Sequence, residues 1–203
     1  MNYPVDVSNI TLSTSRLTLR PFAESDWDDF FAYASVPGVG EAAGWPHHKS
    51  KEDSKKILDL FMNGKKTFAL VEGSRVIGSL GIEKYSESSF PEFGPYSGRE
   101  IGYVLAKDRW GNGLMSEALR EVVRYCFEFL GMDFLLIAYG DFNEGSAGVA
   151  RKAGFLHYRR FASHEYPTLG ACQGWYCLLW NPRCPVPKEI EEPWAATPSP
   201  LGK

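Results

Sequence analysis

The chain has 203 residues, 44% of them hydrophobic, and a formal net charge of −3 at pH 7, which suits one compact globular domain. The slight acidity disfavours a general polyanion binder, so we expect no nucleic-acid partner. Its apolar runs are far shorter than the roughly 20 residues that cross a bilayer and its start lacks a secretory signal, so we expect a cytoplasmic protein without a membrane partner.

The first predicted strand is Arg16-Leu17-Thr18-Leu19-Arg20, in which polar and apolar residues alternate before Pro21 removes a backbone donor. Acidic residues after Ser25 predict the positive end of a first helix. A second helix is expected from Ser50, where Asp53 three residues later gives an approximate capping box. Two helices therefore follow the first strand.

Three strands are expected next, and they favour an antiparallel meander. Thr67 to Glu72 and Arg75 to Tyr85 are rich in strand-forming residues, and the Gly73-Ser74 pair between them suits a hairpin turn. A loop rich in Ser, Pro and Gly runs from Ser86 to Gly98, and Arg99 to Ala106 forms the third strand of this group.

A long amphipathic helix follows, in which apolar residues recur at helical spacing from Leu114 to Leu130, and Gly131 is placed to end it. Phe134 to Tyr139 is almost entirely apolar, as in a strand covered on both faces. Strand, helix and strand in this order predict a parallel crossover. The remaining elements are a helix from about Gly145 to Ala153 and two closing strands, Phe155 to Phe161 and Gln173 to Trp180.

The end of the chain changes composition, because six prolines lie beyond Asn181. Such a segment is expected not to pack regularly, so the sequence predicts a domain over residues 1–182 and a tail from Arg183 to Lys203. Zinc is not expected, because the cysteines lack the paired spacing of a metal site. They are Cys126, Cys172, Cys177 and Cys184.

Gly111 and Gly113 lie between a strand and the long helix, where unpaired N–H groups and the helix dipole make an anion site. A Walker loop is not expected at Gly64-Lys65, because this Gly-Lys pair lacks the rest of that motif. A dinucleotide-binding fingerprint would need a third glycine or alanine at Ser116. A Rossmann-type nucleotide-binding regulatory domain is therefore disfavoured but stays an alternative.

A series of short motifs runs in order from about residue 11 to residue 181. They are Arg16-Leu17-Thr18-Leu19-Arg20-Pro21, Gly78 within Val76-Ile77-Gly78-Ser79-Leu80-Gly81, Glu100-Ile101-Gly102-Tyr103-Val104-Leu105, Trp110-Gly111-Asn112-Gly113-Leu114-Met115-Ser116-Glu117-Ala118-Leu119, Asn143, Ser146 and Lys152-Ala153-Gly154-Phe155. Together they resemble the GCN5-related N-acetyltransferases (GNAT), and especially the branch that acetylates ribosomal-protein N-termini. The resemblance implies an α/β fold with a mixed, mostly antiparallel sheet whose fourth and fifth strands are parallel and splayed.

The resemblance also implies a co-substrate, acetyl-CoA (coenzyme A), and no metal. The family's acyl-CoA loop falls on residues 110–115, where Trp110 and Met115 depart from the usual residues. Because this loop binds through backbone N–H groups, cofactor binding is still expected. The backbone of Tyr103 to Leu105 would pair with the pantetheine arm, and an N–H near Leu105 would stabilise the oxyanion. The cofactor-binding residues so implied are Tyr103, Val104, Leu105, Trp110, Gly111, Asn112, Gly113, Leu114, Met115, Ser116, Asn143 and Ser146.

Three residues are candidates for catalysis. Many members of the family carry a tyrosine that acts as the general acid, at the position that is Ala150 here. In this branch the resemblance implies Ser146 as the proton donor instead. It also implies that Asn143 binds pantetheine or a water. Glu100, near the start of the strand that meets the thioester, is the candidate base. Alternatives are His47 and His48 in the expected acceptor loop, and more weakly Tyr139, His157 and Tyr166.

The sequence thus predicts an N-acetyltransferase in which a primary amine attacks the thioester directly. The acceptor is left open between a protein N-terminus and a small-molecule amine, and a homodimer is neither required nor excluded. The missing tyrosine at Ala150 keeps a non-catalytic acyl-CoA-binding module as an alternative.

Overall fold

The fold is built on one eight-stranded sheet in the order β1-β2-β3-β4-β5-β6-β8-β7, seen in a computed structural model that describes residues 1–166 and 170–195. Adjacent strands are antiparallel except β5 and β6, which are parallel. The strands are β1 (Leu12–Ser13), β2 (Thr18–Pro21), β3 (Thr67–Glu72), β4 (Arg75–Glu83), β5 (Gly98–Leu105), β6 (Phe134–Gly140), β7 (Leu156–Tyr166) and β8 (Gly170–Trp180).

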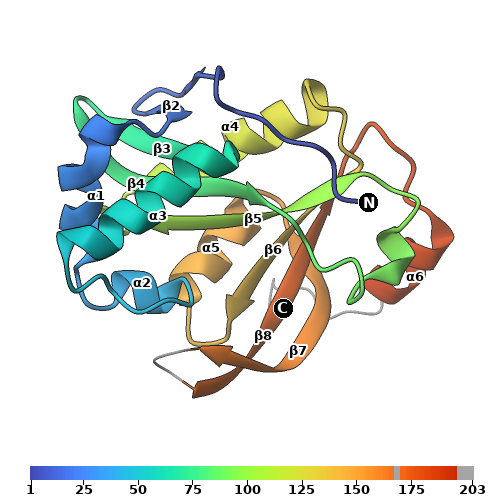
Figure 1. Ribbon diagram of the computed structural model, residues 1–203. Helices are drawn as coiled ribbons and strands as arrows, with labels where there is room; N and C mark the ends of the chain where they lie inside the picture. Colours follow the sequence, from blue (N-terminus) through green and yellow to red (C-terminus); the bar gives the residue numbers. More distant parts are fainter. Residues whose placement is uncertain (167–169, 196–203) are drawn as a thin grey trace.

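Helices cover both faces of this sheet (Figure 1). α1 and α3 pack together over β3 and β4 on one face, and α4 and α5 contact each other on the opposite face. The helices are α1 (Trp27–Ala34), α2 (Val39–Ala42), α3 (Lys51–Gly64), α4 (Leu114–Glu128), α5 (Glu144–Lys152) and α6 (Lys188–Ala195).

Two helix starts show how well the caps could be predicted. The capping box at the start of α3 is confirmed, because Ser50 accepts the Asp53 N–H and the Asp53 carboxylate accepts the Ser50 N–H. The first helix begins at Trp27 rather than directly after Ser25. A short 3-10 turn precedes it, in which the Asp26 carboxylate binds Arg20 and the Ala23 N–H.

β5 and β6 are joined by α4 in the predicted parallel crossover, and they then separate. Their pairing consists of Gly98 with Phe134, Arg99 with Leu135 and Glu100 with Leu136, although β5 continues to Leu105 and β6 to Gly140. The resulting gap in the sheet is visible in Figure 1. The mainly antiparallel order of the other strands excludes the Rossmann-type alternative, which requires a parallel sheet.

A second apolar cluster beside the main core receives α6. It contains the buried aromatic residues Phe93, Phe134 and Trp180, and Ile190 of α6 is fully buried against it. The Tyr96 hydroxyl also donates to Glu189 at 2.7 Å. Ile190 therefore packs against the domain, although the proline-rich segment was expected not to pack regularly. The domain boundary at residue 182 stays a prediction. Residues 196–203 lie outside the described residues.

Candidate active site

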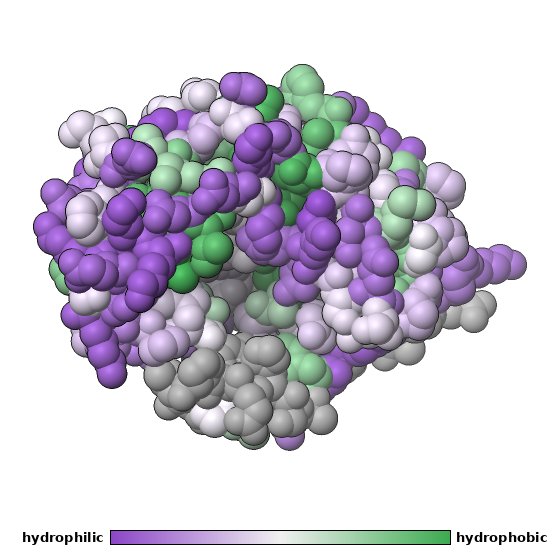
Figure 2. All heavy atoms as spheres, in the orientation of Figure 1, coloured by the Kyte–Doolittle hydropathy of each residue, from purple (hydrophilic) through white to green (hydrophobic). Residues whose placement is uncertain are grey.

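One large cavity of about 1620 Å³ extends through the gap between β5 and β6. On one side it reaches the start of α4 and the first turns of α5, and on the other it reaches α3 and the segment that follows α2. The face drawn in Figure 2 is hollowed near its centre, and both hydrophobic and hydrophilic residues border the hollow. A molecule in this cavity can therefore contact both faces of the sheet at once.

The loop before α4 has the backbone shape of an anion site. Gly111 (φ 78°) and Gly113 (φ 76°) adopt the left-handed conformation that favours glycine, and Gly113 caps α4 directly. The N–H groups of the first helical turn have no acceptor within the helix and carry the positive end of its dipole. Trp110 donates its indole N–H to the Leu105 carbonyl at 2.8 Å, which holds the loop against β5.

Most residues predicted to bind a cofactor line this cavity. The exception is Asn112, which does not line it and whose side chain instead donates to the carbonyls of Arg109 and Trp110. This turn-forming role could not be predicted from the sequence, because the loop motif places no constraint on that side chain. Tyr103, Val104, Leu105, Trp110, Gly111, Gly113, Leu114, Met115, Ser116, Asn143 and Ser146 all border the cavity.

The backbone of β5 presents unpaired groups to the gap. The Ala106 N–H donates to Ile77 of β4 at 2.7 Å, and alternate residues of an antiparallel strand present their backbone groups to opposite neighbours. Tyr103 and Leu105 therefore face the side from which β6 has departed. Because the Leu105 carbonyl already accepts the Trp110 indole, the groups left open are the Leu105 N–H and both backbone groups of Tyr103.

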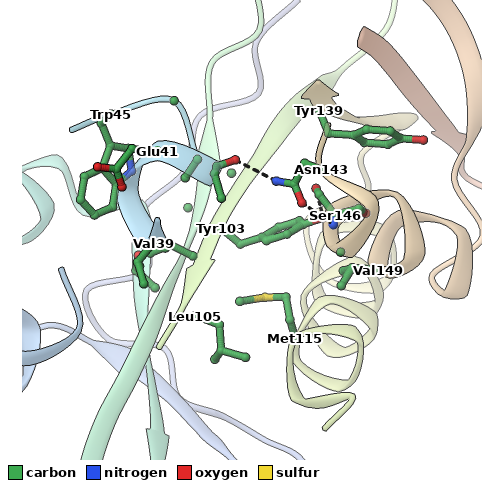
Figure 3. Close-up of a pocket in the computed structure, with 18 of the residues that line it drawn as sticks. Val39, Glu41, Trp45, Tyr103, Leu105, Met115, Tyr139, Asn143, Ser146 and Val149 are labelled. Carbon is green, nitrogen blue, oxygen red and sulfur yellow. Dashed lines mark hydrogen bonds between the residues drawn. The ribbon is translucent and has the colours of Figure 1, made fainter. Parts of the chain in front are cut away.

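A pair of hydroxyl groups spans the gap between β5 and α5. Tyr103 extends from β5 so that its hydroxyl lies 2.8 Å from the Ser146 hydroxyl (Figure 3). Burial raises the pKa of Tyr103, although the contact with Ser146 opposes this, so the phenol stays protonated at neutral pH. Ala150 is buried and has no hydroxyl group to offer at that position of α5. The Tyr103 side chain is the feature that sequence reasoning missed, because only the backbone of Tyr103 was considered.

Asn143 has a structural task that Ser146 lacks. Its Oδ1 accepts the Ser146 N–H at 2.9 Å as the N-cap of α5, and its Nδ2 donates to the Ala42 carbonyl at 2.8 Å. Asn143 thereby joins α2 to α5 across the cavity (Figure 3). The Ser146 hydroxyl is not the cap of this helix, and its contact is with Tyr103.

Glu100 faces the cavity from β5 with a perturbed carboxyl group. Burial, and next the negative charge of the neighbouring Glu83, raise the pKa of Glu100 to about 7. Glu83 lies directly opposite on β4 and forms an ion pair with Lys66. A carboxyl group with this pKa is half ionised near neutral pH, which suits it to accept a proton.

The two candidate histidines border the same cavity but are already hydrogen-bonded. His47 Nδ1 lies 2.7 Å from Glu41, which also accepts the Gly38 N–H at the start of α2. Although burial alone would raise the pKa of Glu41, hydrogen bonds led by the one from His47 lower it to about 2. His48 Nδ1 lies 2.7 Å from the Ser54 hydroxyl, and burial lowers the pKa of His48. Both histidines thus have evident roles in shaping this segment.

The weaker candidates divide between the cavity wall and its surroundings. Tyr139 of β6 lines the cavity, and its hydroxyl lies 2.9 Å from His157 Nε2. His157 stacks on Trp175 outside the cavity lining. The side chain of Tyr166 lies outside the described residues.

No helix in the described part of the chain is long and apolar enough to cross a membrane. Residues 1–166 and 170–195 contain no cluster of His, Cys, Asp and Glu that could hold a metal ion.

Comparison with known protein families gives one family match. The family described as Acetyltransferase (GNAT) domain matches residues 16–156. The uncharacterized N-acetyltransferase p20 of Bacillus licheniformis is 30% identical over 131 residues, which cover 61% of this chain and 69% of that relative. The FsC-acetyl coenzyme A-N(2)-transacetylase of Aspergillus fumigatus is 23% identical over 171 residues, covering 81% of this chain and 73% of that protein.

Solved structures with the same fold agree with this match. A GNAT-family acetyltransferase from Bacillus anthracis superposes with a TM-score of 0.74 at 20% identity, covering 85% of this chain and 99% of that one. RimL, a ribosomal L7/L12 alpha-N-protein acetyltransferase in complex with coenzyme A, superposes with a TM-score of 0.70 at 18% identity. The superposed region covers 84% of this chain and 98% of the RimL chain. At these identities the likeness is one of fold.

Proposed function

The chain belongs to the GNAT acetyltransferase family and is an acetyl-CoA-dependent N-acetyltransferase, and we propose that a primary amine held beside Glu100 attacks the thioester directly in the gap between β5 and β6. The observation that carries this proposal is the continuous cavity through that gap. It lets the cofactor approach from the face of α4 and α5 while the acceptor approaches from the face of α1 and α3.

The loop before α4 binds the pyrophosphate of acetyl-CoA in this proposal. Gly111 and Gly113 leave the backbone accessible, and the open N–H groups of the first helical turn supply donors. The pantetheine arm pairs with the open backbone groups of Tyr103 as an added strand. The Leu105 N–H then donates to the carbonyl oxygen of the thioester, where negative charge develops during attack.

Glu100 is the base of the proposed reaction. Amines are mostly protonated at neutral pH, so the acceptor must lose a proton before or during attack. Glu100 lies on the same face of the sheet as the acceptor side of the cavity, and its pKa of about 7 lets it take this proton through a water molecule. The nitrogen then forms a bond to the acetyl carbon while the carbon–sulfur bond breaks.

Tyr103 and Ser146 receive the leaving thiolate. Their paired hydroxyls lie toward α5. Because side chains alternate between the two faces of a strand, Tyr103 and Glu100 lie on opposite faces of β5. One hydroxyl donates a proton to the departing sulfur, and the pair recovers that proton from the solvent, to which Glu100 and the acylated nitrogen release theirs. The products are an N-acetyl amide, coenzyme A and one proton. Tyr103 thereby supplies from β5 the phenol that Ala150 cannot, which argues against a non-catalytic module.

The acceptor in this proposal is a protein N-terminus or a small-molecule amine, and the reaction takes place in the cytoplasm. RimL, which shares the fold, is named for acetylating a ribosomal protein at its N-terminus, and this supports the first class. Both walls of the cavity come from a single chain, so the proposal requires no second copy, and a homodimer stays open.

Incubation with acetyl-CoA and a panel of primary amines tests the proposed function, with products identified by mass spectrometry and free coenzyme A measured in parallel. We expect one acetylated amine per coenzyme A released. Release of coenzyme A without any acetylated amine, or tight cofactor binding without any release, would contradict the proposal.

A further inference from the structure

The acceptor side of the cavity extends over the sheet, where we call it the trench. On β3, β4 and β5, the residues Thr67, Gly81 and Gly102 lie directly opposite one another and so share one face. All three border the cavity. Because two of them are glycines, this row carries almost no side-chain atoms of its own between β5 and β3; Gly102 is exposed, whereas Gly81 and Thr67 are buried.

Acidic and apolar groups line the two sides of this trench. Glu83 and Glu100 form the neighbouring row, and a Cβ atom added at Gly81 would meet Glu83 Oε1 at 2.5 Å, so this oxygen lies over Gly81. Lys66 binds the other oxygen of that carboxylate, Oε2. On the helical side, Phe30, Ile57 and Phe61 of α1 and α3 border the cavity.

The end of the trench on β3 holds a hydrogen-bonding group that is not used within the domain. Thr67 is 4% exposed, and its Oγ1 has no hydrogen-bond partner among the residues that the structure describes. A buried hydroxyl without a partner carries an energetic cost, which a bound ligand would remove. At the other end of the trench, Gly102 of β5 is exposed. The trench therefore presents a base at its mouth, a carboxylate oxygen along its length and a free hydroxyl at its end.

We propose that the acceptor is an unbranched primary amine that carries a second ammonium group, which lies between Glu83 Oε1 and Thr67 Oγ1 while the reacting amine lies beside Glu100. Glycines on one side and apolar side chains on the other suit a methylene chain without branches. From β5 the second group lies one to two strand spacings away, about 5 to 10 Å, which four or five methylene groups can span. Carboxylates repel an amino-acid carboxylate there, whereas they attract an ammonium group.

This inference rests on the proposed function and is tested by comparing 1,4-diaminobutane, 1,5-diaminopentane and butylamine as acceptors. Butylamine has the same reacting end but no second ammonium group. We expect kcat/KM for a diamine to exceed that for butylamine by about 10-fold or more, because hydrogen bonds to charged groups are among the stronger ones. A protein N-terminal peptide should be a poorer acceptor than either diamine.

Thr67→Val removes the free hydroxyl with little change in shape. The variant should lose about 10-fold in kcat/KM for the diamine and stay within twofold of the parent for butylamine, with thermal stability unchanged or raised because an unpartnered hydroxyl is removed. Glu83→Gln should reduce the ratio of kcat/KM for the diamine to kcat/KM for butylamine. An indirect effect through Glu100 would change kcat/KM for both amines by the same factor and leave this ratio unchanged.

Equal kcat/KM values for butylamine and the diamines would overturn the proposed acceptor, as would a Thr67→Val variant that loses activity toward all of them alike. Preference for the peptide would show that the acceptor is a protein N-terminus. If no amine is acetylated although coenzyme A binds, the proposed function itself fails, so the two failures are distinguishable.

Discussion

Replacing Glu100 with glutamine should make the protein more stable and less active, because the proposed base is held at an energetic cost. Burial, together with the charge of Glu83, raises the pKa of Glu100 from 4.5 to about 7. Each pKa unit corresponds to about 1.4 kcal/mol. Ionised Glu100 therefore destabilises the folded state by roughly 3 kcal/mol.

The direction of the pH dependence follows from proton binding. Between the unfolded pKa of 4.5 and the folded pKa of about 7, the folded protein holds a proton on Glu100 that the unfolded chain has lost. The parent protein therefore loses stability as the pH rises through this range, and the loss is complete above pH 7. Glutamine resembles the protonated carboxyl group and does not titrate, so the stability gained by the variant should appear only as the pH rises.

Denaturant unfolding of Glu100→Gln and parent at pH 5 and pH 8 measures this effect. We expect the variant's advantage to grow by about 2 to 3 kcal/mol between the two values, and its kcat to fall by roughly 100- to 10,000-fold. Glu83→Gln is the matched control, because it removes one of the two causes of the raised pKa. It should move the acidic limb of the kcat/KM profile to lower pH. An advantage that does not change with pH would refute the reasoning about burial and charge, and full activity in Glu100→Gln would refute the assignment of the base.

Three further predictions concern the cofactor site, the hydroxyl pair and the C-terminal helix. Gly113→Glu should abolish coenzyme A binding in a dialysis or calorimetric assay while the far-UV spectrum stays native, because it adds a side chain and a negative charge where phosphate approaches the helix; unchanged affinity would exclude this loop. Tyr103→Phe and Ser146→Ala should each lower kcat more than they weaken cofactor binding, and the double variant should lose little more than the worse single one, since paired residues act as a unit; independent, additive losses would contradict a shared proton path. Ile190→Ala should lower the free energy of unfolding by about 2 to 5 kcal/mol without changing kcat, and a negligible loss would show that α6 does not contribute to the core.

Most of the fold could be predicted because the patterns that specify it are local. The capping box at Ser50, the hairpin after Thr67 and the crossover through the long helix each depend on residues close together in sequence. The separation of β5 from β6 was expected only through the family resemblance, since periodicity fixes which residues form strands and not where two strands stop pairing. α6 was missed because the prolines of the segment beyond Asn181 outweighed Ile190, whose burial depends on distant aromatic residues.

The candidate site was predictable in its backbone features and less so in its side chains. Glycines at 111 and 113 directly indicate a loop that a phosphate can approach. By contrast, the contact between Tyr103 and Ser146 joins residues 43 positions apart, and the influence of Glu83 on Glu100 arises from strand register. Neither relation is visible in a sequence pattern, because both depend on how separate strands and helices are brought together.

A crystal structure with coenzyme A bound would test the central claim most directly. The account predicts the pyrophosphate on the N–H groups at the start of α4, the pantetheine arm in the gap beside Tyr103, and the sulfur within about 3.5 to 4 Å of the Tyr103 or Ser146 hydroxyl. Coenzyme A bound away from this gap, or with its sulfur out of reach of both hydroxyls, would contradict it.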